Sequence, residues 1–325
     1  MNTVQIPGVS FPVSRVCLGC AFLGTRESRE QAFEIMDYYY SKGGRFFNTA
    51  HEYGGGLSER CLGDWVRERG VRNEVVLTSK GGEDVTMPNA AAAHREDLLQ
   101  DIDESLSRMG LDYLDFYMLH VDDLRVGVDE IVSTMEEIMK SGKIRHYGCS
   151  NWTPERQRAA AAYAREHGMQ GFVIDEIEFN LARSNQSNQN ISKWLDESYI
   201  QLHEEDGVCV GAYSSVASGL FEKYIRAGGV SGWHEGLVHL YDNPYNRELA
   251  ERMKKLSSET GWTTSQIMLA WLAQHPYKFP TFALMGASRV SQLEDSLAYE
   301  SIVLTPEMKQ YLRPDWRDFP EGKRI

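Results

Sequence analysis

The stretch FFNTAHEYGGGLSERCLGDWV, residues 46–66, is the clearest guide to the architecture of this chain. Its apolar beginning is typical of a buried strand, which stops at the polar residue Asn48. His51, Glu52 and Tyr53 follow at once, and a run of glycines then leads into a segment with a helical pattern. A buried strand that ends in polar side chains and turns into a helix indicates a β-α unit. In a barrel built of such units, the residues that follow each strand are placed for chemistry.

Eight apolar runs of this kind recur along the chain, and each is followed by a longer segment with helix signals. The runs are residues 15–19, 45–50, 75–80, 113–120, 144–151, 172–179, 208–215 and 282–288. Runs of this length with little alternation suit parallel strands that are covered on both faces. About eight β-then-α units in 325 residues predict an α/β fold, a (β/α)8 TIM barrel that forms a single domain over residues 1–325.

The start of the chain and its glycines refine this architecture. Residues 4–13 hold two short apolar stretches around Pro7 and Gly8, which predict a short N-terminal β-hairpin capping the barrel floor. A doubly wound open sheet is the rival fold, and it usually carries a GxGxxG turn after its first strand. The segment from Gly19 to Gly24 lacks that spacing, so the barrel is favoured.

Several helix boundaries can be read from local signals. Ser28 with glutamine three residues later resembles a capping box, and Thr153 followed by proline is a helix start. Residues 97–110 carry an apolar stripe and end at a glycine suited to a C-cap. Residues 222–245, rich in Gly, His, Trp and Tyr, are predicted to form an extended loop that walls a pocket.

The composition excludes several classes of partner. A formal net charge of -13 disfavours nucleic acid and anionic membrane surfaces. No segment has the roughly 18 consecutive apolar residues of a membrane helix, and the first residues lack a secretory signal. Five scattered cysteines indicate reduced thiols and a cytoplasmic protein. Cys17 and Cys20 have the spacing of a redox or zinc pair, but no second pair accompanies them, so we expect no metal site.

Polar or ionisable residues occur at or just after the predicted strands. In chain order they are Asn48 and Tyr53, Lys80, His120, Ser150 and Asn151, Glu176, Tyr213 and Ser214, and Ser288 and Arg289. Any one of them alone has an ordinary explanation as a solvated or structural residue. Because the carboxyl ends of barrel strands meet at one rim, their joint occurrence predicts a functional site there.

The motifs FNTAHEYG, LTSK, YMLH, GKIRHYGCSN, AYSS and GASRVSQLEDSL follow one another in this order. With them the chain resembles the aldo-keto reductase family over nearly its full length. The resemblance implies an oxidoreductase that interconverts a carbonyl and an alcohol on a (β/α) barrel, binds NADPH in an extended form and uses no metal. It implies catalytic roles for Tyr53, Lys80 and His120, with Asn48 at the position that pairs with the lysine.

The resemblance also implies where NADP would lie. It assigns the nicotinamide amide to Ser150, Asn151 and Glu176, the stacking ring to Tyr213, the pyrophosphate to Ser214, Val216, Ser218, Gly219 and Leu220, and the adenosine end to Gly286, Ser288, Arg289, Gln292, Asp295 and Ser296. The chemistry is reasonable, because a phenol with a pKa near 10 is a weak acid that a nearby ammonium strengthens. The planar donors of Arg289 suit a phosphate and favour NADPH over NADH.

Three positions depart from the pattern of the family. It has aspartate where this chain has Asn48 and commonly glutamine where it has Glu176. Its adenine-contacting asparagine is replaced by Ser296, preceded by Asp295, so we expect weaker adenine recognition. Asn48 keeps an acceptor for Lys80 but lacks the charge, so Lys80 either stabilises a Tyr53 phenolate more strongly or loses its own proton. Asn48→Asp is then expected to raise turnover. A carboxylate beside the nicotinamide would favour its cationic form, so we expect tight NADP⁺ binding or a preference for alcohol oxidation. The register leaves open whether Asp175 or Glu178 takes this place instead.

The substrate and the reaction type leave alternatives. Aromatic and acidic residues that could reach the rim suit a sugar-like or polyol substrate, although they could equally be packing residues; they are Trp152, Trp194, Trp233, His234, His239, Asp122 and Asp123. One rival function is a cofactor-binding regulatory module with little turnover, as in relatives that serve as potassium-channel β-subunits. Another is an enzyme that uses its bound cofactor transiently, in epimerisation or elimination. The sequence leaves the oligomeric state open.

Overall fold

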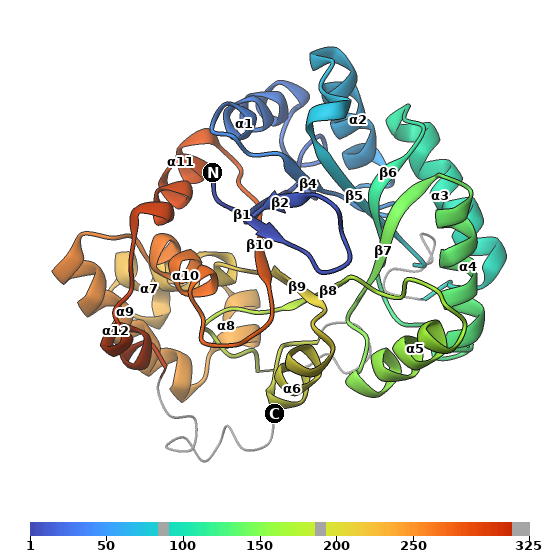
Figure 1. Ribbon diagram of the computed structural model, residues 1–325. Helices are drawn as coiled ribbons and strands as arrows, with labels where there is room; N and C mark the ends of the chain where they lie inside the picture. Colours follow the sequence, from blue (N-terminus) through green and yellow to red (C-terminus); the bar gives the residue numbers. More distant parts are fainter. Residues whose placement is uncertain (84–90, 186–192, 314–325) are drawn as a thin grey trace.

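The computed structural model describes residues 1–83, 91–185 and 193–313. Eight parallel strands close into a barrel in the order β10-β3-β4-β5-β6-β7-β8-β9, and helices surround it (Figure 1). The strands are β3 (Val16–Gly19), β4 (Phe46–Asn48), β5 (Val76–Gly81), β6 (Leu114–Leu119), β7 (Ile144–Ser150), β8 (Ile174–Glu178), β9 (Cys209–Tyr213) and β10 (Thr281–Met285). Each lies within or largely overlaps one of the eight predicted runs, so the predicted (β/α)8 barrel is confirmed.

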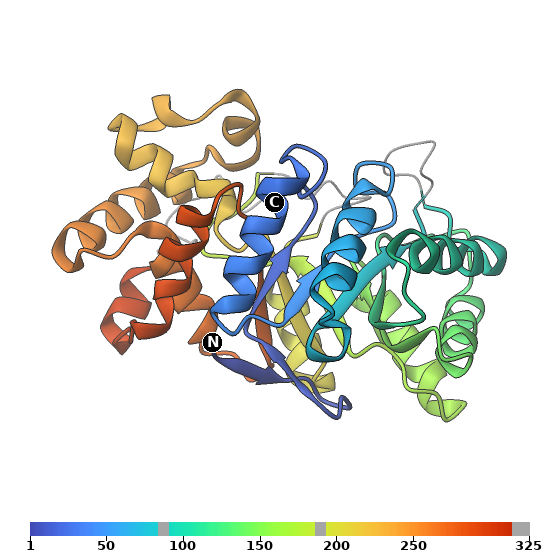
Figure 2. The ribbon, with the colours of Figure 1, turned by 90° about the horizontal axis from the view of Figure 1, so that it is seen from above.

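A hairpin closes the amino-terminal end of the barrel. Strands β1 (Thr3–Gln5) and β2 (Pro12–Ser14) pair antiparallel and lie across that end, as the view of Figure 1 and the view from above in Figure 2 show. Apolar residues of the hairpin are buried against Phe46, Phe116 and Phe282 from the barrel interior. The Phe46 and Phe282 rings pack edge to face, 4.9 Å apart. The predicted floor is therefore a packed plug of aliphatic and aromatic side chains.

The helices begin and end largely where the local signals place them. They are α1 (Arg29–Ser41), α2 (Leu57–Arg69), α3 (Arg95–Met109), α4 (Val128–Lys140), α5 (Pro154–Glu166), α6 (Glu197–Asp206), α7 (Leu220–Ala227), α8 (Glu235–Tyr241), α9 (Pro244–Thr260), α10 (Thr264–Ala273), α11 (Val290–Leu297) and α12 (Pro306–Tyr311). Short 3-10 turns are η1 (Arg72–Glu74), η2 (Ala217–Gly219), η3 (Val230–Gly232) and η4 (Ala298–Ser301). Ser28 completes its capping box, Gly110 ends α3 in a left-handed conformation and Thr153 caps α5. None of these described helices is both long and apolar enough to cross a lipid bilayer.

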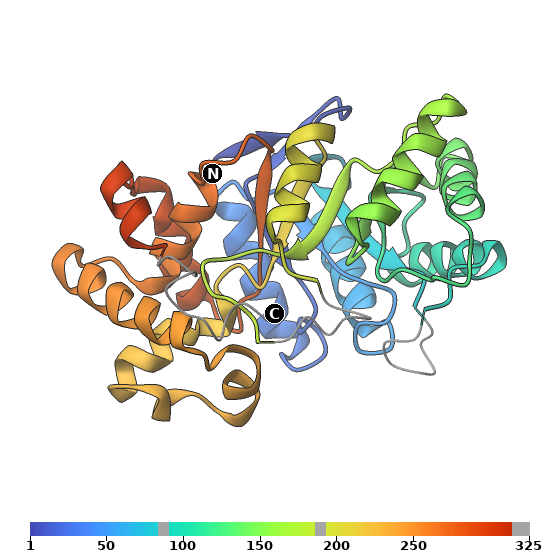
Figure 3. The ribbon, with the colours of Figure 1, turned by 90° about the horizontal axis from the view of Figure 1, so that it is seen from below.

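The prediction of an extended loop over residues 222–245 is wrong. The segment folds as most of α7, then η3 and α8, at the end of the barrel opposite the hairpin (Figures 2 and 3). Its aromatic residues are the physical reason, because Tyr224, Trp233 and Tyr241 are buried. The indole N–H of Trp233 also donates to the backbone oxygen of Leu220 at 2.9 Å. The glycines that suggested a loop only separate short helices.

Candidate functional site

A deep pocket lies at the carboxyl ends of the barrel strands. Its volume is about 780 Å³, which is within the range of small-molecule sites. Each barrel strand, or the residue that follows it, contributes to the lining with Gly19, Asn48, Lys80, His120, Ser150, Glu176, Tyr213 and Met285. All of the candidates that the sequence placed along the rim, except Arg289, thus line one pocket.

Lys80, near the end of β5, is enclosed by side chains from two other strands. Its ammonium donates hydrogen bonds to the side-chain oxygen of Asn48 and, at 2.9 Å, to the backbone oxygen of Thr49. Glu176 Oε2 lies 3.5 Å from the same ammonium, and Asn48 Nδ2 donates to Glu176 Oε1 at 2.6 Å. The expected contact of Asn48 with Lys80 is present. The expectation that Lys80 lacks a carboxylate partner is wrong, because Glu176 supplies one from β8.

The neighbouring carboxylates of β8 are occupied outside this group. Asp175 lies 3.1 Å from His203 of α6, and both residues are fully buried. Glu178 accepts a hydrogen bond from the Tyr241 hydroxyl of α8. Side chains alternate along a strand, and Glu176 is the acidic residue of β8 that lines the pocket. This settles the register that the sequence left open.

Tyr53, in the loop between β4 and α2, adjoins this charged group. The Lys80 ammonium lies 5.0 Å from the centre of the Tyr53 ring. Burial raises the pKa of the Tyr53 phenol above its ordinary value; Lys80 lowers that pKa and Glu176 raises it, and the net shift is upward. The sequence led us to expect a lowered pKa. The influence of Lys80 has the expected sign, but burial outweighs it.

The protonation of Lys80 follows from its partners. Burial lowers the pKa of the ammonium, but Glu176 and Tyr53 raise it, and the net shift is upward. Lys80 therefore stays charged at neutral pH. Of the two outcomes left open by the sequence, loss of the lysine proton is the one that this environment opposes.

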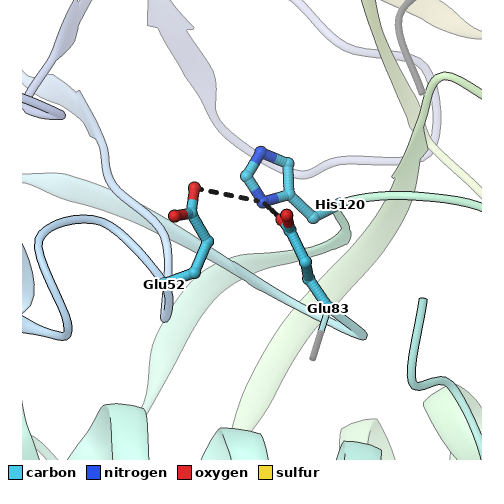
Figure 4. A group of neighbouring side chains, drawn as sticks. All are labelled: Glu52, Glu83 and His120. Carbon is cyan, nitrogen blue, oxygen red and sulfur yellow. Dashed lines mark ion pairs between the residues drawn. The ribbon is translucent and has the colours of Figure 1, made fainter. Parts of the chain in front are cut away.

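His120, directly after β6, lies between the phenol and two carboxylates. Its ring meets the Tyr53 ring edge to face, with 5.5 Å between their centres. Its Nδ1 lies 3.0 Å from Glu83 Oε2 and 3.9 Å from Glu52 Oε1 (Figure 4). Burial raises the pKa of the Glu52 carboxyl. This side of the pocket is therefore rich in oxygen acceptors.

One cation could contact all three of these side chains. The ligand atoms of Glu52, Glu83 and His120 lie within 4.8 Å of one another. Acidic groups commonly lie this close together without an ion, so their proximity alone does not indicate a metal. The thiols of Cys17 and Cys20 are free and buried, and burial raises the pKa of both.

A hydrogen-bond network fixes one wall of the pocket beside Glu176. Ser150 Oγ donates to the backbone oxygen of Glu176 at 2.8 Å, and Asn151 Nδ2 donates to Ser150 Oγ at 2.9 Å. Asn151 Oδ1 accepts from the Tyr213 hydroxyl at 2.8 Å and from the Lys193 N–H at 2.9 Å. The Tyr213 ring is held in place by these bonds as a flat surface of the pocket.

The segment between β9 and α7 has a backbone suited to an anion. Ser214, Ala217 and Ser218 have φ angles of 52°, 45° and 52°, in the left-handed region that non-glycine residues seldom adopt. Ser214, Val216 and Ser218 line the pocket, as does Lys223. Lys223 Nζ donates to the Ser218 backbone oxygen at 2.7 Å. Hydroxyls, a lysine and the start of a helix are groups that bind phosphates.

The residues after β10 extend this wall. Gly286, Ser288 and Gln292 line the pocket, and Gln292 Oε1 accepts from both the N–H and the hydroxyl of Ser288 at 3.0 Å. Arg289 is exposed at the start of α11, where its Nε donates to Ser291 Oγ at 3.2 Å. An extended ligand that begins at Tyr213 would therefore reach an exposed guanidinium.

Some residues assigned to the cofactor by resemblance do not line the pocket. They are Gly219, Leu220, Arg289, Asp295 and Ser296. Asp295 is turned toward α10, where it accepts hydrogen bonds from Thr263 Oγ1 at 2.9 Å and Gln266 Nε2 at 3.0 Å. These bonds join α11 to the beginning of α10, so the side chain of Asp295 has a structural task.

The aromatic and acidic residues that the sequence offered for a sugar-like substrate do not line the pocket. Trp152 and Trp233 are buried in the core, and Asp122 is bound by Arg156 at 2.8 Å. The others, Asp123, Trp194, His234 and His239, are likewise absent from the described lining. Of the two interpretations that the sequence left open, packing or ion pairing is the one that applies to Trp152, Trp233 and Asp122.

Residues to which the sequence assigned no role lie in the remaining part of the pocket. The loop after β3 contributes Phe22, Arg26 and Glu27, together with Glu52 and Glu83 from the loops after β4 and β5. The ring of Phe22 is 47% exposed, and the Arg26 guanidinium lies 4.0 Å from its centre. The available signal was position alone, since residues after a barrel strand lie at the catalytic end.

The sequence is similar to known proteins over nearly its whole length. The model of the Aldo/keto reductase family matches residues 15–314. Norsolorinic acid reductase B of Dothistroma septosporum is 26% identical over 318 residues, which cover 92% of this chain and 77% of that protein. The uncharacterized oxidoreductase YrpG of Bacillus subtilis is 28% identical over 313 residues, covering 92% and 91%. The putative aryl-alcohol dehydrogenase AAD14 of Saccharomyces cerevisiae is 25% identical over 325 residues, covering 92% and 82%.

The fold agrees with a solved structure as well. The thermostable aldo-keto reductase Tm1743, determined with the inhibitor epalrestat, superposes with a TM-score of 0.72 over 96% of this chain and 98% of that chain, at 22% identity. That likeness concerns the fold, whereas the family model covers the sequence from the first barrel strand to the last helix. This chain therefore belongs to the aldo/keto reductase family of oxidoreductases.

Proposed function

We propose that this protein is an NADP(H)-dependent oxidoreductase that interconverts a carbonyl and an alcohol, with Tyr53 as general acid and base. The observation that carries the proposal is the convergence of a phenol, an ammonium and an imidazole in one pocket. Tyr53, Lys80 and His120 come from loops or ends of successive strands, and all three line it. Reduction of a carbonyl creates a negative oxygen, which needs a proton donor and nearby positive charge.

Each of the three side chains has a distinct task. Tyr53 donates its proton to the carbonyl oxygen, and its raised pKa keeps the phenol protonated at neutral pH. Lys80 remains charged and stabilises the phenolate that forms. His120, edge to face with the Tyr53 ring, is placed to donate a hydrogen bond to the same oxygen. In the reverse direction the phenolate accepts the proton of the alcohol.

The residues present fit a dinucleotide. The flat Tyr213 ring, the amide and hydroxyl network of Ser150 and Asn151 and the left-handed segment with Lys223 line the pocket. The exposed Arg289 directly follows the lining residue Ser288. These groups match a ring, an amide, a pyrophosphate and a terminal phosphate in that order. A bound reduced nicotinamide would supply the hydride.

The substrate that suits the remaining space is neutral and bears hydroxyl groups. Glu27, Glu52 and Glu83 lie around the pocket with Arg26 and the exposed ring of Phe22. Carboxylates accept hydrogen bonds from hydroxyls and repel other carboxylates, and an exposed ring packs against a sugar face. We therefore propose a sugar-like or polyol substrate, contacted by these residues and not by those that the sequence suggested. The free, buried cysteines agree with a reducing cytoplasm.

The test is steady consumption of NADPH with a panel of neutral hydroxylated carbonyls, for wild type and Tyr53→Phe. The variant keeps the ring and removes the proton donor, so we expect turnover to fall by roughly 10²–10⁴-fold with cofactor affinity unchanged. Equal turnover of the two proteins would contradict the role of Tyr53. Tight binding of cofactor without consumption would instead support a regulatory module or transient use of the cofactor, and analysis of isomerised or eliminated products separates those two.

A further inference from the structure

Both carboxylate oxygens of Glu176 have partners within the protein. Oε1 accepts a hydrogen bond from Asn48 Nδ2 at 2.6 Å, and Oε2 lies 3.5 Å from the Lys80 ammonium. Glu176 and Lys80 are each 2% exposed and Asn48 is 1% exposed. Each carboxylate oxygen of Glu176 therefore has a partner from β4 or β5, and the Lys80 ammonium balances its charge within the protein.

The barrel leaves space for this side chain. Glu176 is in register with Gly211 of the neighbouring strand β9. A Cβ at position 211 would lie 2.9 Å from Glu176 Cγ and 2.8 Å from Phe282 Cζ, closer than such atoms approach one another. The absence of a side chain at Gly211 therefore lets Glu176 extend across the barrel to Lys80.

Asn48 joins the other two residues because its two ends have opposite character. Its Nδ2 donates to the carboxylate, and its Oδ1 accepts from the ammonium. Aspartate at this position would set a second oxygen within hydrogen-bond distance of Glu176 Oε1. Two carboxylates that close do not both ionise, so the earlier expectation that Asn48→Asp raises turnover is reversed.

We propose that Glu176 is a positioning residue that keeps Lys80 charged and directed at Tyr53, with Asn48 as the bridge between them. The proposal rests on the proposed function, since Lys80 must act on Tyr53 during turnover. In this proposal the negative charge of Glu176 acts on Lys80 and not on the nicotinamide. The titratable groups that interact electrostatically with Lys80 are Glu176, Tyr53, Cys17, Cys20 and Glu52. Among the described residues, Glu176 alone forms an ion pair with it.

The experiment moves the carboxylate from one strand to the other. Glu176→Gln, Asn48→Asp and the double variant are compared with wild type by kcat for carbonyl reduction and by ¹³C NMR titration of Lys80, assigned with Lys80→Arg. In Glu176→Gln we expect kcat to fall about 10-fold or more and Lys80 to lose its proton at lower pH, because the buried ammonium has lost its counter-ion. Asn48→Asp is expected to lower kcat as well.

The double variant is the decisive protein. Glutamine at position 176 can donate a hydrogen bond to aspartate at position 48, and that aspartate contacts Lys80. The same group of a carboxylate, an amide and an ammonium then forms, with the negative charge on β4 instead of β8. We expect kcat within about threefold of wild type and a Lys80 titration restored toward it. If Glu176→Gln alone does not fold and the double variant does, that rescue supports the proposal too.

Asp175→Asn is the matched control, because Asp175 is an equally buried carboxylate on the same strand that contacts His203 instead of Lys80. It should leave the Lys80 titration unchanged. A double variant as impaired as Glu176→Gln, or a Lys80 titration insensitive to Glu176→Gln, overturns the proposal. A wild type that reduces no carbonyl, with the Lys80 titration shifted as expected, would refute the proposed function and leave the ion pair intact.

Discussion

The ring of His120 meets the ring of Tyr53 edge to face, with their centres 5.5 Å apart and an interplanar angle of 79°. This contact holds the imidazole beside the phenol while Glu83 and Glu52 lie near its Nδ1. In the proposed function, His120 donates a hydrogen bond to the same substrate oxygen that Tyr53 protonates.

His120→Asn tests that role. We expect kcat/KM for carbonyl reduction to fall roughly 100-fold, because one preorganised donor to the developing negative charge is lost. The Kd of NADPH should not change. The exposed His167, replaced by asparagine in a parallel variant, serves as the control. A His120→Asn enzyme that loses cofactor affinity and keeps its turnover would show that the imidazole belongs to the cofactor side.

The raised pKa of Tyr53 predicts different pH dependences for the two directions of reaction. Burial is its main cause, opposed by Lys80 and aided by Glu176 and Glu52. Reduction uses the protonated phenol, which dominates at neutral pH, so its rate should be nearly constant there. Oxidation uses the phenolate, whose population grows about tenfold per pH unit below the pKa. Initial rates of alcohol oxidation between pH 7 and about 9 provide the check, and a flat profile would exclude Tyr53 as the base.

Arg289 should set the choice between NADPH and NADH. Its exposed guanidinium stands at the start of α11, just beyond the pocket residue Ser288. Arg289→Gln removes a charged donor to a phosphate, worth roughly 1.5–3 kcal/mol, so the Kd of NADPH should rise about 10- to 100-fold while that of NADH stays constant. Arg26→Gln is the comparison, since Arg26 lies at the other side of the pocket near Phe22. Equal weakening of both cofactors by Arg289→Gln would contradict this assignment.

His275 should make the fold sensitive to mild acid. Burial, with Arg15 and Lys309, lowers the pKa of its imidazole to about 4. Its Nδ1 accepts from the Tyr277 N–H at 3.2 Å, which suits the neutral ring. Because the unfolded chain binds a proton near pH 6.5 and the folded chain only near pH 4, stability is lost as the pH falls through this window.

The loss is about 2–3 kcal/mol of unfolding free energy by pH 4. Urea denaturation at pH 7 and pH 4.5 measures it, and His275→Gln should show a smaller decrease than wild type. His167→Gln, at an exposed histidine, should follow wild type. If all three proteins lose the same free energy of unfolding, His275 is not the group responsible.

The barrel could be predicted because each strand is a local pattern. A strand buried on both faces reads as an apolar run, and eight of them with intervening helix signals leave few alternatives. The rim residues followed from the same reasoning, since the fold itself brings strand ends together. The prediction of a loop over residues 222–245 failed because short helices separated by glycines have no pattern long enough to distinguish them from a loop.

The ion pair of the site lay beyond the sequence for a different reason. Asn48 and Glu176 are 128 residues apart, and their contact depends on Gly211 leaving room on a third strand. The contact of Asp295 could not be predicted for the same reason, because its partner Thr263 caps another helix, α10. Which of two plausible partners a polar side chain takes is decided by the space around it, and no local pattern records that space.

The β1-β2 hairpin has a consequence for traffic through the enzyme. Its plug of apolar side chains against Phe46, Phe116 and Phe282 makes the pocket blind at its base. Among the residues that the structure describes, this packing closes the amino-terminal route to Lys80, so we expect ligands to reach the ammonium from the carboxyl ends of the strands.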